Sequence, residues 1–145
     1  MNNSIYPCLW FDGQAEEAAT FYCSIFKNSK ITTNTPMVVN FELEGKKFMG
    51  LNGGPQFKFN ESVSFVVECD DQKEINHYWK SLTSDGGTAS QCGWLKGKYG
   101  LSWQIIPKRL GELMKGDANK SQQVMQALMT MGKIDIALLE QAHNQ

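Results

Sequence analysis

The stretch PCLWFDGQAEEAATFYCSI at residues 7–25 and the stretch SFVVECDDQKEINHYWKSL at residues 64–82 share one hydrophobic pattern at a constant offset of 57 residues. Each begins with alternating apolar residues, the period of a strand, and continues with apolar residues at helical spacing. The helical positions are Ala18, Phe21, Tyr22 and Ile25 in the first stretch and Ile75, Tyr78, Trp79 and Leu82 in the second. The repeat therefore predicts two copies of a strand followed by a helix that packs on it.

Residues at the ends of both predicted helices agree with this interpretation. Asp12 with Glu16 and Glu17 places acid in the first turn of the first helix, and Asp71 with Glu74 three residues later has the pattern of a capping box for the second. The pair Asn28-Ser29 ends the first helix, and Asp85-Gly86-Gly87 supplies a left-handed residue that ends the second.

Extended segments follow each helix. We expect strands at residues 31–35, 37–44 and 46–52 in the first half and at 88–91, 93–96 and 101–106 in the second. The turn-forming cluster at residues 52–55 separates the halves. The predicted fold class is α+β, with two βαβββ modules at about residues 5–56 and 61–107 and a C-terminal helical tail at 108–145, all within one domain spanning 1–145.

The tail after Pro107 changes to a helical period, with Gly116 and Gly132 dividing it into short helices. Its periodic apolar residues are Leu110, Leu113, Met114, Val124, Leu128, Met131, Ile134 and Leu138. Because a chain of 145 residues has limited surface to cover this stripe, we expect a homodimer.

Composition excludes several classes of protein. The formal net charge is −1 and the hydrophobic fraction is 41%, which indicates a globular chain and argues against a nucleic-acid partner. No run approaches the roughly 18 apolar residues of a membrane helix, and the N-terminus lacks the pattern of a signal peptide, so we expect a cytoplasmic protein with no membrane partner. The cysteines at 8, 23, 69 and 92 contain no C-x-x-C pair, so we expect free thiols.

Motifs for cofactor, metal or nucleophile chemistry are missing. His77 and His143 are the two histidines, and both are expected to be solvated. The sequence has no G-x-x-x-x-G-K-[ST], no G-x-G-x-x-G after a strand and no G-x-S-x-G. We therefore predict no cofactor and no metal.

Four segments carry a resemblance to a known family: LWFDGQAEEAATFYCSIF, FMGLNGGPQFKFNESVSFVVECDD, GLSWQIIP and MQALMTMGKIDIALLEQA. With the repeat, they resemble the PhnB-like family of the vicinal-oxygen-chelate superfamily of glyoxalases, bleomycin-resistance proteins and dioxygenases. Members often carry the label 3-demethylubiquinone-9 3-methyltransferase domain. The resemblance implies eight strands in two modules that form an open barrel around a cleft, usually in a homodimer.

The resemblance also implies where metal ligands would lie. In metal-dependent relatives they come from the first and fourth strands of each module and are typically His and Glu. The 57-residue repeat carries these positions to Pro7, Ser64, Met49 and Gln104. Proline has no ligating side chain, methionine is a soft thioether, and the other two are weak oxygen donors. The departure predicts a site without metal.

Strand alternation then predicts which residues line the cleft. If Phe65 and Val67 face the helix, the residues between them face inward, and the repeat assigns Leu9 and Phe11 to the same inner surface. The expected ligand-binding residues are Leu9, Phe11, Ser64, Val66, Ser102, Gln104 and Ile106. They combine an apolar wall with a few polar groups, which is the composition of a small-molecule site.

Two roles stay open among the polar members of this surface. Gln104 could orient a ligand through its amide, whereas Ser64 and Ser102 could equally bond the backbone. Glu68 is the carboxylate on the inner face and is the candidate catalytic base, if burial raises its pKa.

The main hypothesis is a protein that binds a small apolar or aromatic molecule. The alternative is an enzyme, either a metal-dependent lyase or isomerase of the glyoxalase kind or the methyltransferase that the family label names.

Overall fold

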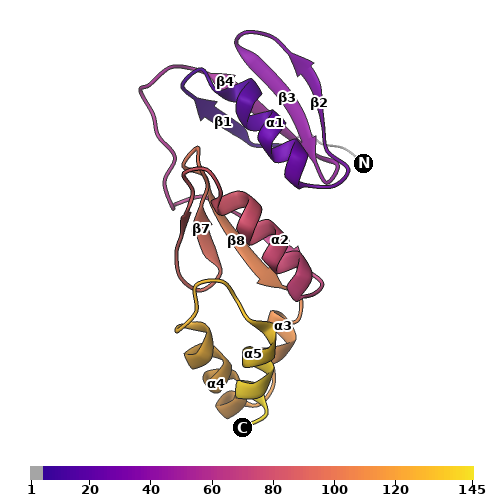
Figure 1. Ribbon diagram of the computed structural model, residues 1–145, viewed down its shortest axis with the longest axis vertical. Coiled ribbons are helices and arrows are strands. Elements are labelled where there is room, and N and C mark those ends of the chain that lie inside the picture. Colours follow the sequence, from indigo (N-terminus) through magenta and orange to yellow (C-terminus); the bar gives the residue numbers. More distant parts are fainter. Residues whose placement is uncertain (1–4) are drawn as a thin grey trace. The chain divides into compact units, whose positions relative to one another are not determined.

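The computed structural model describes residues 5–145 and divides into two compact units, the first ending at Phe59 and the second running from Asn60 to Gln145. Each unit contains one four-stranded sheet with a helix across one face (Figure 1). Between residues 5 and 145, no helix is both long enough and apolar enough to span a bilayer.

The first unit follows the predicted order of strand, helix and three strands. Its elements are β1 (Cys8–Phe11), α1 (Ala15–Ile25), β2 (Lys30–Asn34), β3 (Val38–Leu43) and β4 (Lys46–Asn52). The strand order is β1-β4-β3-β2, with β1 parallel to β4 and the other pairs antiparallel. A parallel pair needs a long crossover connection, and α1 with β2 and β3 supplies it.

Small residues bring α1 close to the first sheet. Ala15, Ala18 and Ala19 are residues of α1, and all three are fully buried. A β-carbon built on Gly50 would lie 3.1 Å from the Ala15 Cβ, which leaves no room for a larger side chain between them. The predicted acid in the first turn of α1 is present as Glu16 and Glu17, and the backbone N–H of Ala15 donates to the side-chain oxygen of Asn52 on β4 at 2.9 Å.

The second unit repeats the same plan. Its elements are β5 (Ser64–Cys69), α2 (Gln72–Thr83), β6 (Thr88–Ala89), β7 (Trp94–Lys96) and β8 (Ser102–Pro107), in the strand order β5-β8-β7-β6. Strand β5 runs parallel to β8. The predicted cap of α2 is confirmed: Asp71 accepts from the Glu74 N–H at 2.9 Å, and the Glu74 carboxylate accepts from the N–H of Asp70 at 2.6 Å.

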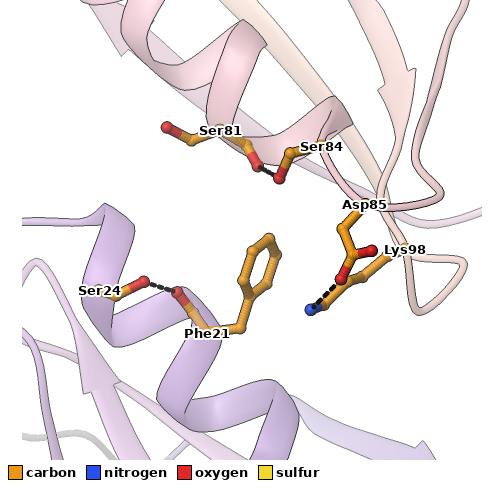
Figure 2. Close-up of polar contacts among 6 residues, drawn as sticks. All are labelled: Phe21, Ser24, Ser81, Ser84, Asp85 and Lys98. Atoms are coloured by element: carbon orange, nitrogen blue, oxygen red, sulfur yellow. Dashed lines mark hydrogen bonds and ion pairs between the residues drawn. The ribbon is translucent and has the colours of Figure 1, made fainter.

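Serine hydroxyls form hydrogen bonds to backbone carbonyls at the C-terminal ends of both helices (Figure 2). The Ser24 hydroxyl donates to the Phe21 carbonyl at 2.6 Å in α1, and the Ser84 hydroxyl donates to the Ser81 carbonyl at 2.7 Å after α2. The chain then turns at Asp85, whose φ is 53°, and Lys98 binds the Asp85 carboxylate at 3.2 Å. The predicted left-handed stop after the second helix is therefore confirmed.

The tail folds into α3 (Leu110–Leu113), α4 (Ala118–Leu128) and α5 (Ile136–His143). Their buried core consists of Leu113, Val124, Leu128, Met131, Ile134 and Leu139. The sequence pattern selected Leu138, but Leu139 is the buried residue and Leu138 is half exposed. The amide of Gln72 on α2 ties the tail down, since it donates to the Ile134 carbonyl at 2.9 Å and accepts from the Ile136 N–H at 2.8 Å.

The prediction of an α+β fold built from two βαβββ modules and C-terminal helices is confirmed. The strands form two four-stranded mixed sheets, and over residues 5–145 neither closes into a barrel. The tail belongs to the second compact unit.

Candidate functional site

The second sheet has one face covered by α2 and one face turned away from it. Leu95 and Trp103 pair with one another on the covered face, and a β-carbon built on Gly97 would approach both α2 and the Trp103 ring. Strand alternation therefore turns the intervening residues to the opposite side. We call this side the distal face, defined by Ser64, Val66, Glu68, Trp94, Lys96, Ser102, Gln104 and Ile106.

The strand register arranges the distal face in rows. Across the parallel pair, Ser64 lies opposite Ser102 and Val66 lies opposite Gln104. Trp94 is the neighbour of Gln104 on the other side, across the antiparallel pair. One row thus runs from the apolar Val66 through the Gln104 amide to the Trp94 indole.

Backbone hydrogen bonds show that the antiparallel neighbours on this face approach closely. The Gly97 N–H donates to the Leu101 carbonyl and the Ile105 N–H donates to the Gly93 carbonyl, each at 2.8 Å. The pairs between these bonds, Trp94 with Gln104 and Lys96 with Ser102, are therefore of the kind that exchange no backbone bonds. Side chains come closest in such pairs.

Three polar side chains of the distal face lie on the neighbouring strands β5 and β8. The Gln104 amide nitrogen donates to the Ser64 hydroxyl at 2.9 Å. Ser102 is 1% exposed, and its hydroxyl oxygen makes no hydrogen bond with any described residue. A buried polar atom without a partner is unusual in a folded protein.

An ion pair borders these polar groups. The Lys96 ammonium lies 3.0 Å from the Glu61 carboxylate, which precedes β5. The hydrogen bond from Lys96 is the main cause that lowers the pKa of Glu61, with the charge of Lys96 acting in the same direction. Both side chains are partly exposed to solvent.

The remaining predicted residues are Val66 in the central row and the pair of Glu68 and Ile106 at one end of the face. Val66 is 52% exposed, so an apolar side chain is available in the central row. Glu68 is exposed at the end of β5, and the desolvated surroundings expected for a general base are not found around it. Ile106 lies opposite Glu68 and packs against the core of the tail.

The predicted orientation of Leu9 and Phe11 is wrong. They are 6% and 2% exposed, and a β-carbon built on Gly50 would lie between Ala15 of α1 and the Phe11 ring, so both residues belong to the covered face of the first sheet. The error comes from applying the 57-residue offset of the repeat to the strands as well as to the helices. Three residues connect β1 to α1 but two connect β5 to α2, and a shift of one residue exchanges the two faces of a strand.

The first sheet therefore presents other residues on the face away from α1. Trp10 is held there by a hydrogen bond from its indole nitrogen to the Gly54 carbonyl at 2.8 Å and by edge-to-face contact with Phe57. Asn40 donates to the Thr33 hydroxyl at 2.8 Å, while its side-chain oxygen is buried with no hydrogen bond to the described residues. Sequence reasoning missed Trp10 and Asn40, and the extra residue at Asp12–Gln14 was the signal that could have found them.

The donor groups at the family's metal positions do not suit a divalent ion. Aligning the strand ends makes Tyr6, rather than Pro7, the equivalent of Ser64. Ser64 and Gln104 are a neutral hydroxyl and amide that hydrogen-bond to one another, and Met49 is a thioether. Within residues 5–145, no three His, Cys, Asp or Glu side chains are grouped as metal ligands.

A separate groove of about 400 Å³ lies between α4 and α5. Its lining is uncharged, with glutamines around an apolar floor that includes Met131 and Leu138. None of the residues predicted for the site from the sequence lines it.

The two serines of the distal face should respond oppositely to removal of the hydroxyl. Ser64→Ala breaks the bond to Gln104 and should lower the free energy of unfolding by about 1 kcal/mol. Ser102→Ala removes a buried hydroxyl that has no partner, so the free energy of unfolding should stay the same or rise by up to about 1 kcal/mol. Urea denaturation measures both, and a loss at Ser102 as large as that at Ser64 would contradict the assignment.

Comparison with known proteins agrees with this architecture. The sequence profile of the family described as 3-demethylubiquinone-9 3-methyltransferase matches residues 3–106, which leaves the helical tail outside the match. No curated protein matches the chain significantly.

Solved protein structures are also similar to this chain. A PhnB protein from Bacillus cereus, provisionally described as a 3-demethylubiquinone-9 3-methyltransferase, has 30% identity and a TM-score of 0.65, covering 72% of this chain and 98% of its own. A Pseudomonas aeruginosa protein has 16% identity and a TM-score of 0.60, covering 71% of this chain and 96% of its own.

The fosfomycin resistance protein FosX from Listeria monocytogenes, solved with Mn(II) and sulfate, shares the fold at 10% identity with a TM-score of 0.56, covering 72% of this chain and 89% of its own. The chain belongs to the PhnB-like family described as 3-demethylubiquinone-9 3-methyltransferase.

Proposed function

We propose that the chain binds a small apolar or aromatic molecule on the distal face of the second sheet and that it does so without a metal. The observation that carries the proposal is the buried Ser102 hydroxyl, which has no partner among the described residues and lies beside the bonded pair of Gln104 and Ser64. A ligand that donates or accepts there would satisfy a group that the fold leaves unsatisfied.

The apolar part of the ligand would contact the central row. Val66 is half exposed on β5, and the Trp94 indole flanks Gln104 from β7. A mainly apolar surface with a few fixed polar groups is the usual composition of small-molecule sites. Ile106, at the end of β8, extends the same face, whereas Leu9 and Phe11 are buried under α1 and are left out of the proposed surface.

The donor set supports the proposal of binding without metal. FosX, which has the same fold, was solved with Mn(II). In this chain Ser64 and Gln104 occupy the family's positions in the second unit, and hard divalent ions prefer carboxylate or imidazole ligands over a neutral hydroxyl and amide.

Enzymatic activity is the second candidate, favoured by the description of the family as a methyltransferase. A glyoxalase-type lyase or isomerase belongs to the same candidate. In either reaction Glu68 would be the base, and its exposed position at the end of β5 would have to be closed off from water by the substrate.

The proposal extends to assembly and location. Met125, Met129 and Leu138 are exposed apolar side chains on the tail, at 42%, 61% and 50%, and their burial would favour a homodimer. The four cysteines are all unpaired, which suits the reducing conditions of the cytoplasm. Neither nucleic acid nor a membrane is a proposed partner.

The neutral fluorescent probe N-phenyl-1-naphthylamine tests the binding surface directly. Gln104→Ala should weaken its binding by about 1–3 kcal/mol, because the substitution breaks the polar centre of the face and leaves Ser64 unpaired. Gln122→Ala makes the same change at an exposed position of α4 and should leave binding unchanged. Fluorescence titration measures all three proteins.

Two results would contradict the binding proposal. One is that the folded wild-type protein binds no probe. The other is catalysed turnover of a quinol methyl acceptor or a glyoxalase-type substrate that Glu68→Gln abolishes, since this substitution keeps the shape and removes the base.

Metal analysis tests the other half of the proposal. Protein purified without chelators should contain no stoichiometric nickel, zinc or manganese by elemental analysis. A bound ion at 100 times its dissociation constant would add about 2.7 kcal/mol to the free energy of unfolding. A clear rise in melting temperature on adding any of these ions would therefore overturn the metal-free proposal.

Sedimentation velocity tests the assembly. A homodimer is expected at micromolar concentration, and Met129→Lys should shift the equilibrium toward monomer because it places a charge on the exposed apolar surface of the tail. Wild-type protein that sediments only as a monomer would contradict the dimer.

A further inference from the structure

Lys96 is the one cationic residue of the distal face. It stands opposite Ser102 in a pair without mutual backbone bonds, so the base of its side chain lies close to that of Ser102, whose hydroxyl has no partner. Its ammonium has three N–H donors, and the contact at 3.0 Å to the Glu61 carboxylate uses one of them. The remaining donors are available at the edge of the proposed binding surface.

The ion pair with Glu61 leaves the Lys96 ammonium able to bind a second anion. The Lys96 side chain is 41% exposed and that of Glu61 is 65% exposed. Ion pairs exposed to this degree contribute little to stability, because water screens the charges and ordering the long side chains costs entropy. A second anion can therefore share the ammonium or replace Glu61 at small cost to the fold.

The carboxylate of Glu68, on the distal face itself, is too far along the strand to oppose an anion at Lys96. Lys96 shares a row with Ser102 and Ser64, whereas Glu68 is four residues beyond Ser64 on β5. That separation is about 13 Å at the rise of an extended strand. Because Glu68 is exposed, salt screens its charge over about 8 Å under physiological conditions.

We propose that the molecule bound on the distal face carries one anionic oxygen group, a carboxylate, sulfonate or phosphonate, that binds the Lys96 ammonium beside Ser102 while the apolar body lies over Val66 and Trp94. The inference rests on the proposed function and names the class of its ligand. Glu61 then acts as a competing anion that holds the ammonium in place until the ligand arrives.

Two probes of nearly the same shape separate the charge from the apolar body. 8-Anilinonaphthalene-1-sulfonate carries a sulfonate, and N-phenyl-1-naphthylamine is the same ring system without it. Wild-type protein should bind the sulfonate about five- to tenfold more tightly, the ratio expected for one partly exposed charge-assisted hydrogen bond. Added sodium chloride should weaken the sulfonate's binding and leave the neutral probe's unchanged.

Three variants assign that preference to a residue. Lys96→Met keeps the apolar stem and should reduce sulfonate affinity to that of the neutral probe, whose own affinity should not change. Lys98→Met removes the same charge from the turn, where the side chain binds Asp85, and should preserve the preference. Glu61→Gln should strengthen sulfonate binding, because the competing carboxylate is gone.

The outcomes test the proposed binding function and the proposed anion site separately. Failure of both probes to bind overturns the proposed function, and this inference with it. Equal affinity of wild-type protein for the two probes, or an undiminished preference in Lys96→Met, overturns the anion inference alone. A preference lost equally in Lys96→Met and Lys98→Met would also overturn it, because it would reflect net charge rather than a site.

Discussion

The parallel pairing of β5 with β8 is the constraint on which the site depends. It joins the first and last strands of the module and places Ser64, Val66 and Glu68 opposite Ser102, Gln104 and Ile106. Because α2 covers the other side of the sheet, all six side chains belong to the distal face. A shift of β5 by one residue relative to β8 would turn Phe65 onto the distal face and bury Ser64 under the helix.

Much of the architecture could be predicted, because hydrophobic period is a local signal. The two strand–helix repeats, the Asp71 cap of α2 and the short helices of the tail all follow from residues near one another in sequence. The orientation of Leu9 and Phe11 could not be obtained by transferring the second half onto the first. A single additional residue in the connection at Asp12–Gln14 preserves the helix pattern and reverses the strand.

The chemistry of the site was only partly predictable, for a different reason. Ser64, Ser102 and Gln104 follow from alternation along β5 and β8, which are clear strands. Trp94 and Lys96 reach the distal face only because the three-residue strand β7 pairs with β8 in one particular register. Backbone hydrogen bonds at Gly93 and Gly97 set that register. The unsatisfied state of the Ser102 hydroxyl is a property of the folded surroundings and leaves no mark in the sequence.

The most direct test of the account is to map where a small molecule binds. Backbone amide chemical shifts of isotopically labelled protein, followed during titration with 8-anilinonaphthalene-1-sulfonate, report the contact surface residue by residue. The account predicts that the largest changes fall on residues 64–68, 94–96 and 102–106, the three strands of the distal face. Changes confined to the groove between α4 and α5 would contradict it, because that groove shares none of these residues.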